Sequence, residues 1–221
     1  MEEWIYRPDP KADWMSLIFL LNLVILAVLY KLDPNRLKSL VNILKPRIYF
    51  GKYSYEKELN YFSYFNALSF FLIASSLTLT YFSLSAYSSN PLYYSFEYYY
   101  LLIGVSAILF FRHIITQIIA NQLGFQRVIK MALYKNFSLA TQSSIILIGL
   151  VFLWNYSSLP LIIIESILVL IALFWGINQF TIYFSFFKSR SEDLIYIILY
   201  LCTVKLAPWI WVYLVFVETK L

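Results

Sequence analysis

The sequence predicts an all-α integral membrane protein. Residues 1–221 are expected to form one domain, a six-helix transmembrane bundle with an amphipathic surface helix in the first cytoplasmic loop. Three observations predict this class. Of the 221 residues, 61% are hydrophobic and 13% are charged, whereas soluble chains are about half apolar and about a quarter charged. Six apolar runs are long enough to cross about 30 Å of hydrocarbon as helices. Basic residues gather in the connections on one side of these runs.

The apolar runs define six predicted spans. The first could instead be a secretory signal peptide, but its leader holds four acidic residues against two basic ones, and no small-residue cleavage pattern follows it. We therefore interpret it as a retained spanning helix. It is short for a span, so flanking residues are expected to extend it. The spans cover residues 14–30, 62–86, 98–123, 137–156, 161–187 and 194–217.

The connection after the first span contains the predicted surface helix. In "DPNRLKSLVNILKP", Asp33 can cap a helix that begins at Pro34 and that Pro46 ends. Its apolar residues share one face, and Arg36 and Lys38 are expected away from that face. This pattern is typical of a helix that lies in the membrane surface, and the alternative is a solvated basic linker. The apolar face consists of Leu37, Leu40, Val41 and Leu44.

The distribution of basic residues predicts the orientation. Twelve lie in connections on the side of the first loop, three lie on the opposite side, and Arg112 and Lys205 lie within spans. Because cytoplasmic loops are enriched in Lys and Arg, both termini are expected outside the cytoplasm. The net charge of +5 is therefore attributed to loops on the cytoplasmic side of a membrane. The expected partner is the lipid bilayer, and no nucleic acid is expected. The twelve residues are Lys31, Arg36, Lys38, Lys45, Arg47, Lys52, Lys57, Arg127, Lys130, Lys135, Lys188 and Arg190.

Ionisable residues inside the spans are functional candidates, because a charge near the bilayer centre costs about 3 kcal/mol or more. At about 1.5 Å per residue, Lys205 lies roughly 18 Å from the outer end of its helix, while Glu165 lies only about 6 Å from that side. Pro208 cannot donate to the carbonyl of Val204, so a helix kink is expected beside the lysine. The candidate intramembrane polar site consists of Arg112, His113, Gln117, Glu165 and Lys205.

Polar residues also recur at helical spacing. In "RHIITQIIANQLG", His113 and Gln117 share a face, and polar residues occur at similar depth in the next two spans. They predict a polar-lined region open to the cytoplasm; the alternative is that these spans end earlier and the residues are interfacial. A second stripe on the second span predicts a seam where helices pack closely. It consists of Ser69, Ser76, Thr80 and Ser83.

Two segments carry a resemblance to a known family. The segment "YIILYLCTVKLAPWIWVYL" and a leader of the form R-x-D-P-x-x-D-W resemble the bacterial family known as domain of unknown function 4271, multi-span inner-membrane proteins of Bacteroidota. In its pattern Tyr-Leu-Cys-x-x-Glu-x-x-Pro, Lys205 takes the acidic position. The resemblance covers nearly the whole chain. It implies an inner-membrane setting, hence periplasmic termini, and no activity. The matching residues are Tyr200, Leu201, Cys202 and Pro208.

No catalytic signature occurs in the sequence, which lacks a Walker loop, His-Glu-x-x-His and Gly-x-Ser-x-Gly. One histidine and one cysteine make a zinc-type site implausible, and no cofactor or metal is expected. The first hypothesis is a non-enzymatic component that binds or helps assemble a membrane-protein partner. The alternative is a small carrier or channel for a proton, ion or small anion that uses Lys205, Arg112 and His113. A lipid-acting enzyme ranks third, because Glu165 and His113 are expected at different depths.

Overall fold

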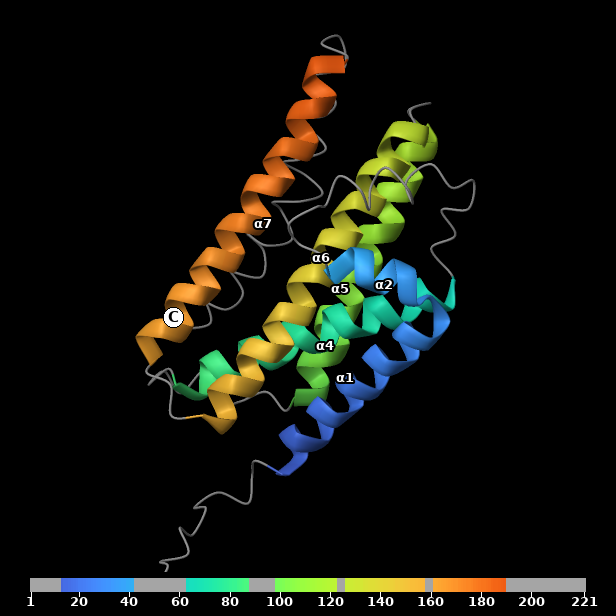
Figure 1. Ribbon diagram of the computed structural model, residues 1–221. Helices are drawn as coiled ribbons and strands as arrows, with labels where there is room; N and C mark the ends of the chain where they lie inside the picture. The colour runs from blue at the N-terminus through green and yellow to red at the C-terminus, as the bar shows by residue number, and fades with distance from the viewer. Residues whose placement is uncertain (1–12, 42–62, 88–97, 123–125, 158–160, 190–221) are drawn as a thin grey trace, which may run out of the picture.

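The computed structural model describes five stretches of the chain, and all of them are mainly helical (Figure 1). Five of the six helices in these stretches are long and apolar enough to cross a membrane, which confirms for the described residues an all-helical fold of membrane-spanning character. The predicted sixth span, 194–217, lies outside the described residues. The described stretches are residues 13–41, 63–87, 98–122, 126–157 and 161–189. The helices are α1 (Asp13–Leu32), α2 (Pro34–Val41), α4 (Tyr64–Tyr87), α5 (Tyr98–Gln122), α6 (Gln126–Tyr156) and α7 (Leu161–Ser189).

Local capping explains where two of these helices begin. The amide of Arg36 donates a 2.9 Å hydrogen bond to Oδ1 of Asp33, so Asp33 caps α2 as the sequence predicts. The amide of Asn66 donates a 3.3 Å bond to Oγ of Ser63, which caps α4 in the same way. The amide at the first position of a helix has no acceptor within the helix, so Pro34, which has no amide hydrogen, can begin α2.

Helix α6 begins earlier than the sequence predicts. The fourth span is expected to begin at Phe137, but α6 begins at Gln126 and runs for 31 residues, about 46 Å. The added turns contain Arg127, Lys130 and Lys135. Lys and Arg are good helix formers, so a basic segment can continue a helix beyond the hydrocarbon. Hydropathy locates the apolar part of such a helix and misses its polar extension.

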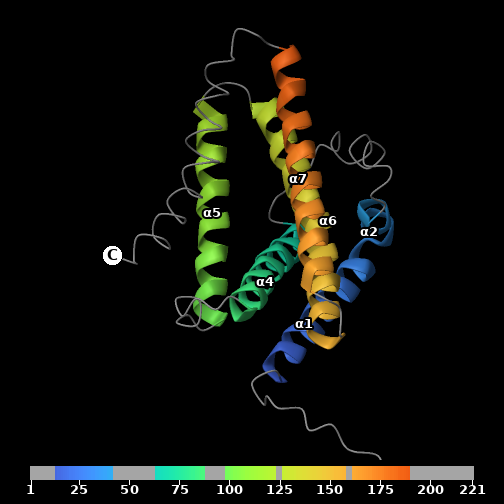
Figure 2. The ribbon, with the colours of Figure 1, turned by 90° about the vertical axis from the view of Figure 1, so that its left-hand side faces the viewer.

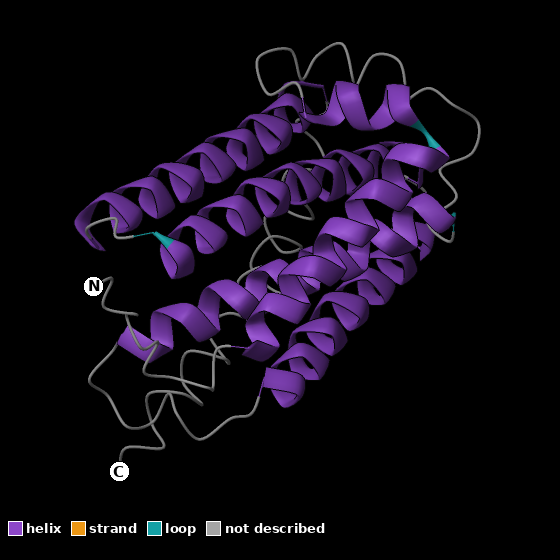
Figure 3. Ribbon diagram, turned by 60° about the horizontal axis from the view of Figure 1, so that its bottom comes forward, coloured by secondary structure: helices purple, strands orange, loops and turns teal. Residues whose placement is uncertain are grey.

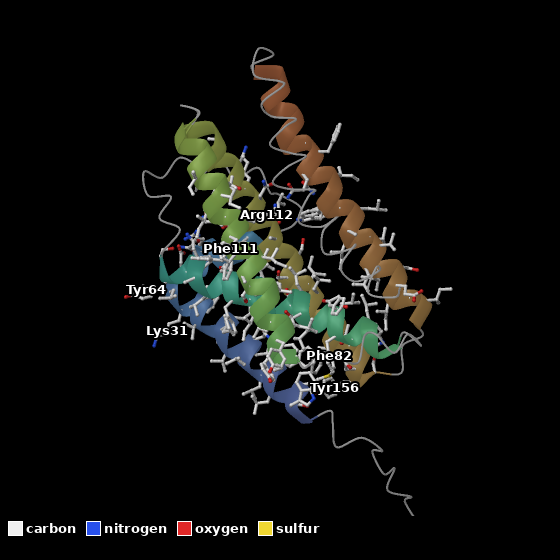
Figure 4. The ribbon with its side chains drawn as sticks, turned by 180° about the vertical axis from the view of Figure 1, so that it is seen from behind. Lys31, Tyr64, Phe82, Phe111, Arg112 and Tyr156 are labelled. Atoms are coloured by element: carbon white, nitrogen blue, oxygen red, sulfur yellow. The ribbon has the colours of Figure 1, made fainter. Side chains whose placement is uncertain are left out.

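Contacts between helix ends show that successive long helices run in opposite directions. The ring of Trp14, near the start of α1, lies 5.1 Å from the ring of Phe82, near the end of α4, and 5.1 Å from that of Tyr98, at the start of α5. Ser16 also hydrogen-bonds the hydroxyl of Tyr156 at the end of α6. We call this the aromatic end. Figure 4 shows Phe82 and Tyr156 there, and Lys31 with Tyr64 at the opposite end, which we call the basic end.

Helices α4 and α6 form the centre of the bundle. In their apolar spans 56% and 61% of the residues are buried, against 22% for α1, 6% for α5 and 11% for α7. In Figure 2, α5 and α7 stand apart from each other. Figure 3 shows that the described stretches are mainly helical throughout the bundle. The predicted packing seam is confirmed, because all four of its residues are buried along α4. Such small side chains let helix backbones approach closely in a membrane.

The central helices are joined by polar contacts as well as apolar ones. The side-chain Nδ2 of Asn155 on α6 donates a 3.3 Å hydrogen bond to Oγ of Ser83 in the seam. A buried apolar cluster joins α1, α4 and α6, where van der Waals contact replaces the hydrophobic effect as the packing force. Its fully enclosed members are Leu29, Leu72, Leu79 and Val151.

Candidate functional site

The structure places three of the predicted site residues and leaves the others without a described side chain. Arg112 and His113 lie on α5 with half-buried side chains, and Glu165 is exposed on α7. Gln117 lies in α5, and its side chain is not described. Lys205 and Pro208 lie outside the described residues, as does any kink at the proline.

The described members of this set are not brought together. Glu165 follows Ile164, which is fully buried and packs against Leu150 and Trp154 at the aromatic end. His113 lies 15 residues into α5 from the same end, about 22 Å along the helix axis. Helices α5 and α7 also stand apart in Figure 2. Glu165 and the pair Arg112 and His113 therefore belong to different depths and different helices.

Hydroxyl groups in the predicted polar region bond within their own helices. Oγ1 of Thr116 donates a 2.8 Å bond to the carbonyl oxygen of Arg112, and Oγ1 of Thr141 donates a 2.9 Å bond to that of Phe137. Oγ1 of Thr181 does the same four residues back on α7, at 2.9 Å. Such bonds satisfy the hydrogen of a hydroxyl within its own helix. These three hydroxyls are thus compatible with a membrane-spanning helix.

A polar site that joins three helices lies at the basic end, where a guanidinium fastens α2 to the bundle. Nη2 of Arg36 donates hydrogen bonds to Oδ1 of Asn66 on α4, at 2.9 Å, and to the hydroxyl of Tyr134 on α6, at 3.1 Å. Its guanidinium carbon lies 4.2 Å from the ring centroid of Phe65, in cation–π geometry. Nε2 of Gln142 donates to the carbonyl oxygen of Leu40. We call Arg36, Asn66, Tyr134 and Gln142 the α2 clamp.

The clamp corrects the sequence interpretation of α2. Arg36 is expected on the solvated side, but it points into the bundle, and Val41 of the predicted apolar face is exposed. The physical reason is the helical repeat: residues four apart lie on one face, so Arg36 belongs with buried Leu40. Its charge-assisted bonds to the acceptors on α4 and α6 compensate for its loss of water. Leu37 and Leu40 are buried, as the sequence predicts.

Exposed basic residues lie beside the clamp. Lys31 in the last turn of α1 and Lys38 in the last turn of α2 are both exposed. The Lys38 ammonium lies 5.9 Å from the ring centroid of Tyr30 on α1. This end of the bundle therefore presents two exposed cationic side chains, one of them close to an aromatic ring.

A buried amide inside α1 is a further polar element that sequence analysis missed. Asn22 is fully buried, and its Oδ1 accepts a 2.7 Å hydrogen bond from Oγ of Ser75 on α4. Its Nδ2 donates a 2.9 Å bond to the carbonyl oxygen of Ile18. The available signal was one amide in the otherwise apolar run "FLLNLVIL", and a search confined to ionisable groups passes over it.

Within the stretches that the structure describes, no three His, Cys, Asp or Glu side chains come together as a metal site. One comparison with known proteins gives a match: the profile of the family described as domain of unknown function (DUF4271) covers residues 15–216. No curated protein and no solved structure matches the chain.

Proposed function

Since the chain belongs to the DUF4271 family, we propose that it is a multi-pass inner-membrane protein without enzymatic activity that binds or helps assemble a membrane-protein partner. We place both termini in the periplasm, from the positive-inside rule, and α2 in the cytoplasmic membrane surface. The partner surface that we propose is the outward face of α7. The next paragraphs give the support for this choice.

The observation that carries the proposal is the contrast between two exposed helix faces. Between Leu17 and Val28 the exposed side chains of α1 are all apolar, as lipid contact requires. On α7 the exposed side chains are mostly apolar but include Glu165, Ser166 and Thr181, which lie toward the ends of the apolar span. A carboxylate on an outward transmembrane face favours contact with protein, because ionisable groups in a span face a bundle interior or another helix.

Site-directed photo-crosslinking in cells tests the proposal with matched positions. Leu170 on α7 and Leu20 on α1 have almost equal exposure, 64% and 63%. With a photo-reactive residue at Leu170 we expect a discrete adduct to a membrane protein that also co-purifies with the intact chain in mild detergent. With the same residue at Leu20 we expect lipid adducts only. Identical adduct patterns at both positions would contradict the proposal.

The carrier hypothesis remains as a second candidate because Arg112 and His113 are half-buried, side by side, on a membrane-spanning helix. Flux measured in proteoliposomes separates the two functions. Under the partner proposal, His113→Gln and Lys205→Met leave proton and anion flux at the level of empty vesicles, as does the unaltered chain. A flux that the unaltered chain carries and Lys205→Met abolishes would favour the carrier.

A further inference from the structure

The basic end of α1 and α2 has the composition of a headgroup site. Lys31 and Lys38 are exposed, and the Lys38 ammonium lies 5.9 Å from the ring of Tyr30, the residue before Lys31. Lys31 is thus next in sequence to an aromatic residue whose ring lies close to the ammonium of Lys38. Tyr30 and Tyr64 are themselves 49% and 84% exposed, and Figure 4 shows Lys31 and Tyr64 at the same end of the bundle. Exposed tyrosines and lysines together are typical of the membrane interface.

The one carboxylate in residues 30–41 does not neutralise this surface. Oδ1 of Asp33 accepts the amide hydrogen of Arg36 as a helix cap, and its side chain is half-buried. With Lys31, Arg36 and Lys38 in the same segment, the charge balance favours an anion. Both lysines also lie in last turns of helices, where the carbonyl ends of the helix dipole stabilise a cation and hold it near the helix end.

Depth identifies which anion is present there. α1 spans 20 residues, about 30 Å, so Lys31 at its end lies at the level where hydrocarbon meets headgroups. The α2 clamp fixes Lys38 at the same level, since Arg36 and Gln142 tie both parts of α2 to the bundle. A lipid phosphate is the anion that this layer contains at high local concentration.

We propose that Lys31 and Lys38, together with Tyr30, bind the headgroup phosphate of an anionic glycerophospholipid. The α2 clamp holds the helix that carries Lys38 against the bundle, which reduces the entropy lost on binding. The site does not depend on α7 or on a protein partner, nor on which leaflet holds the basic end.

Native mass spectrometry of the purified full-length chain tests this site. The protein is taken from micelles that contain phosphatidylglycerol or phosphatidylcholine, and the bound fraction of each lipid is measured. We expect preferential retention of phosphatidylglycerol, and its apparent affinity should fall about five-fold for each of Lys31→Gln and Lys38→Gln, since each basic residue near an anionic surface contributes about that factor. Lys31→Arg and Lys38→Arg should keep most of the affinity.

Lys220→Gln is the matched control, because it removes the same charge at a position outside residues 30–41. An equal loss of phosphatidylglycerol in Lys220→Gln would mean that net charge alone attracts the lipid, and would overturn the site. Unchanged retention in the Lys31→Gln and Lys38→Gln double variant would overturn it as well. If inorganic phosphate displaced the lipid at equal concentration, the site would be one for free anions. Should the double variant fail to fold, Lys38→Gln alone gives the same test.

Discussion

Nη2 of Arg36 on α2 donates a hydrogen bond of 3.1 Å to the hydroxyl of Tyr134 on α6, 98 positions later in the chain. The same nitrogen donates to Asn66 on α4. One guanidinium thus connects the eight-residue helix α2 to both central helices of the bundle. This contact makes α2 an integral part of the fold rather than a loosely attached loop.

Replacing the guanidinium should release α2. We expect Arg36→Gln to lower the free energy of unfolding by about 1.5–3 kcal/mol, because hydrogen bonds to a charged group contribute about that much. Equilibrium unfolding of the full chain in mixed micelles measures it. Lys38→Gln is the control on the same helix and should stay within about 0.5 kcal/mol, since its side chain is exposed. Equal effects of the two changes would contradict the clamp.

Gln142 should act together with Arg36. Gln142→Leu removes the donor to the Leu40 carbonyl and should cost about 1 kcal/mol. In the Arg36→Gln and Gln142→Leu double variant we expect less than the sum of the single effects, because α2 detached by one change no longer makes the other contact. Protease cleavage within residues 33–41 reports the detachment directly. Strict additivity would show that the two contacts hold α2 independently.

The amide inside α1 offers a test of buried polar packing. Ser75→Ala leaves Oδ1 of Asn22 without its donor and should destabilise the bundle by about 0.6 kcal/mol, with about 1.7 kcal/mol as the upper bound for such bonds in membranes. Adding Asn22→Leu should recover much of this loss, since removing both partners leaves no unsatisfied group. Ser166→Ala, on an exposed face of α7, is the control and should have no effect on unfolding.

The aromatic end should depend on Trp14. Trp14→Ala removes the edge contact with Phe82 and the tilted contact with Tyr98, each at 5.1 Å, and should cost about 1–3 kcal/mol, from about 0.5–1.5 per aromatic pair. Trp14→Phe should retain most of the stability. Thermal unfolding in detergent distinguishes these outcomes. It is monitored by far-ultraviolet circular dichroism, which does not rely on tryptophan fluorescence. An equal loss in both variants would mean that the indole edge, and not ring packing, is required.

Orientation is open to a labelling test at two exposed residues of opposite ends. In a Cys202→Ser background, Tyr64→Cys should react with a membrane-impermeant maleimide only after the membrane is opened, and Tyr99→Cys should react in intact cells. Both side chains are well exposed, so access and not burial decides the result. The reverse pattern would invert the topology, and reaction of both in intact cells would contradict the alternation of the helices.

The sequence located the five long apolar helices of the described residues because apolar length is a local property, and the sixth span, 194–217, stays a prediction. The periodicity of hydroxyl residues also located the buried seam of α4, since small residues at helical spacing in a span usually mark a face where helices pack closely. The inward positions of Arg36 and Asn22 could not be predicted, because whether a polar group faces water or another helix depends on residues that are distant in the chain. Asn66 and Tyr134, which accept from Arg36, lie 30 and 98 positions away. The early start of α6 was not predicted, because its basic residues continue the helix but do not raise the mean hydropathy that locates a span.

These separations also bear on the order in which the chain is made. The side-chain amide of Asn22 can bond to Ile18 as soon as α1 forms, while Ser75 is added to the chain 53 residues after Asn22. For α2 the delay is longer, since Tyr134 and Gln142 follow their partners by 98 and 102 positions. The second helix to be translated is therefore among the later ones to reach its final contacts. Until α6 is made, Arg36 lacks its acceptor on Tyr134, so nascent chains that end before α6 should expose α2 to protease.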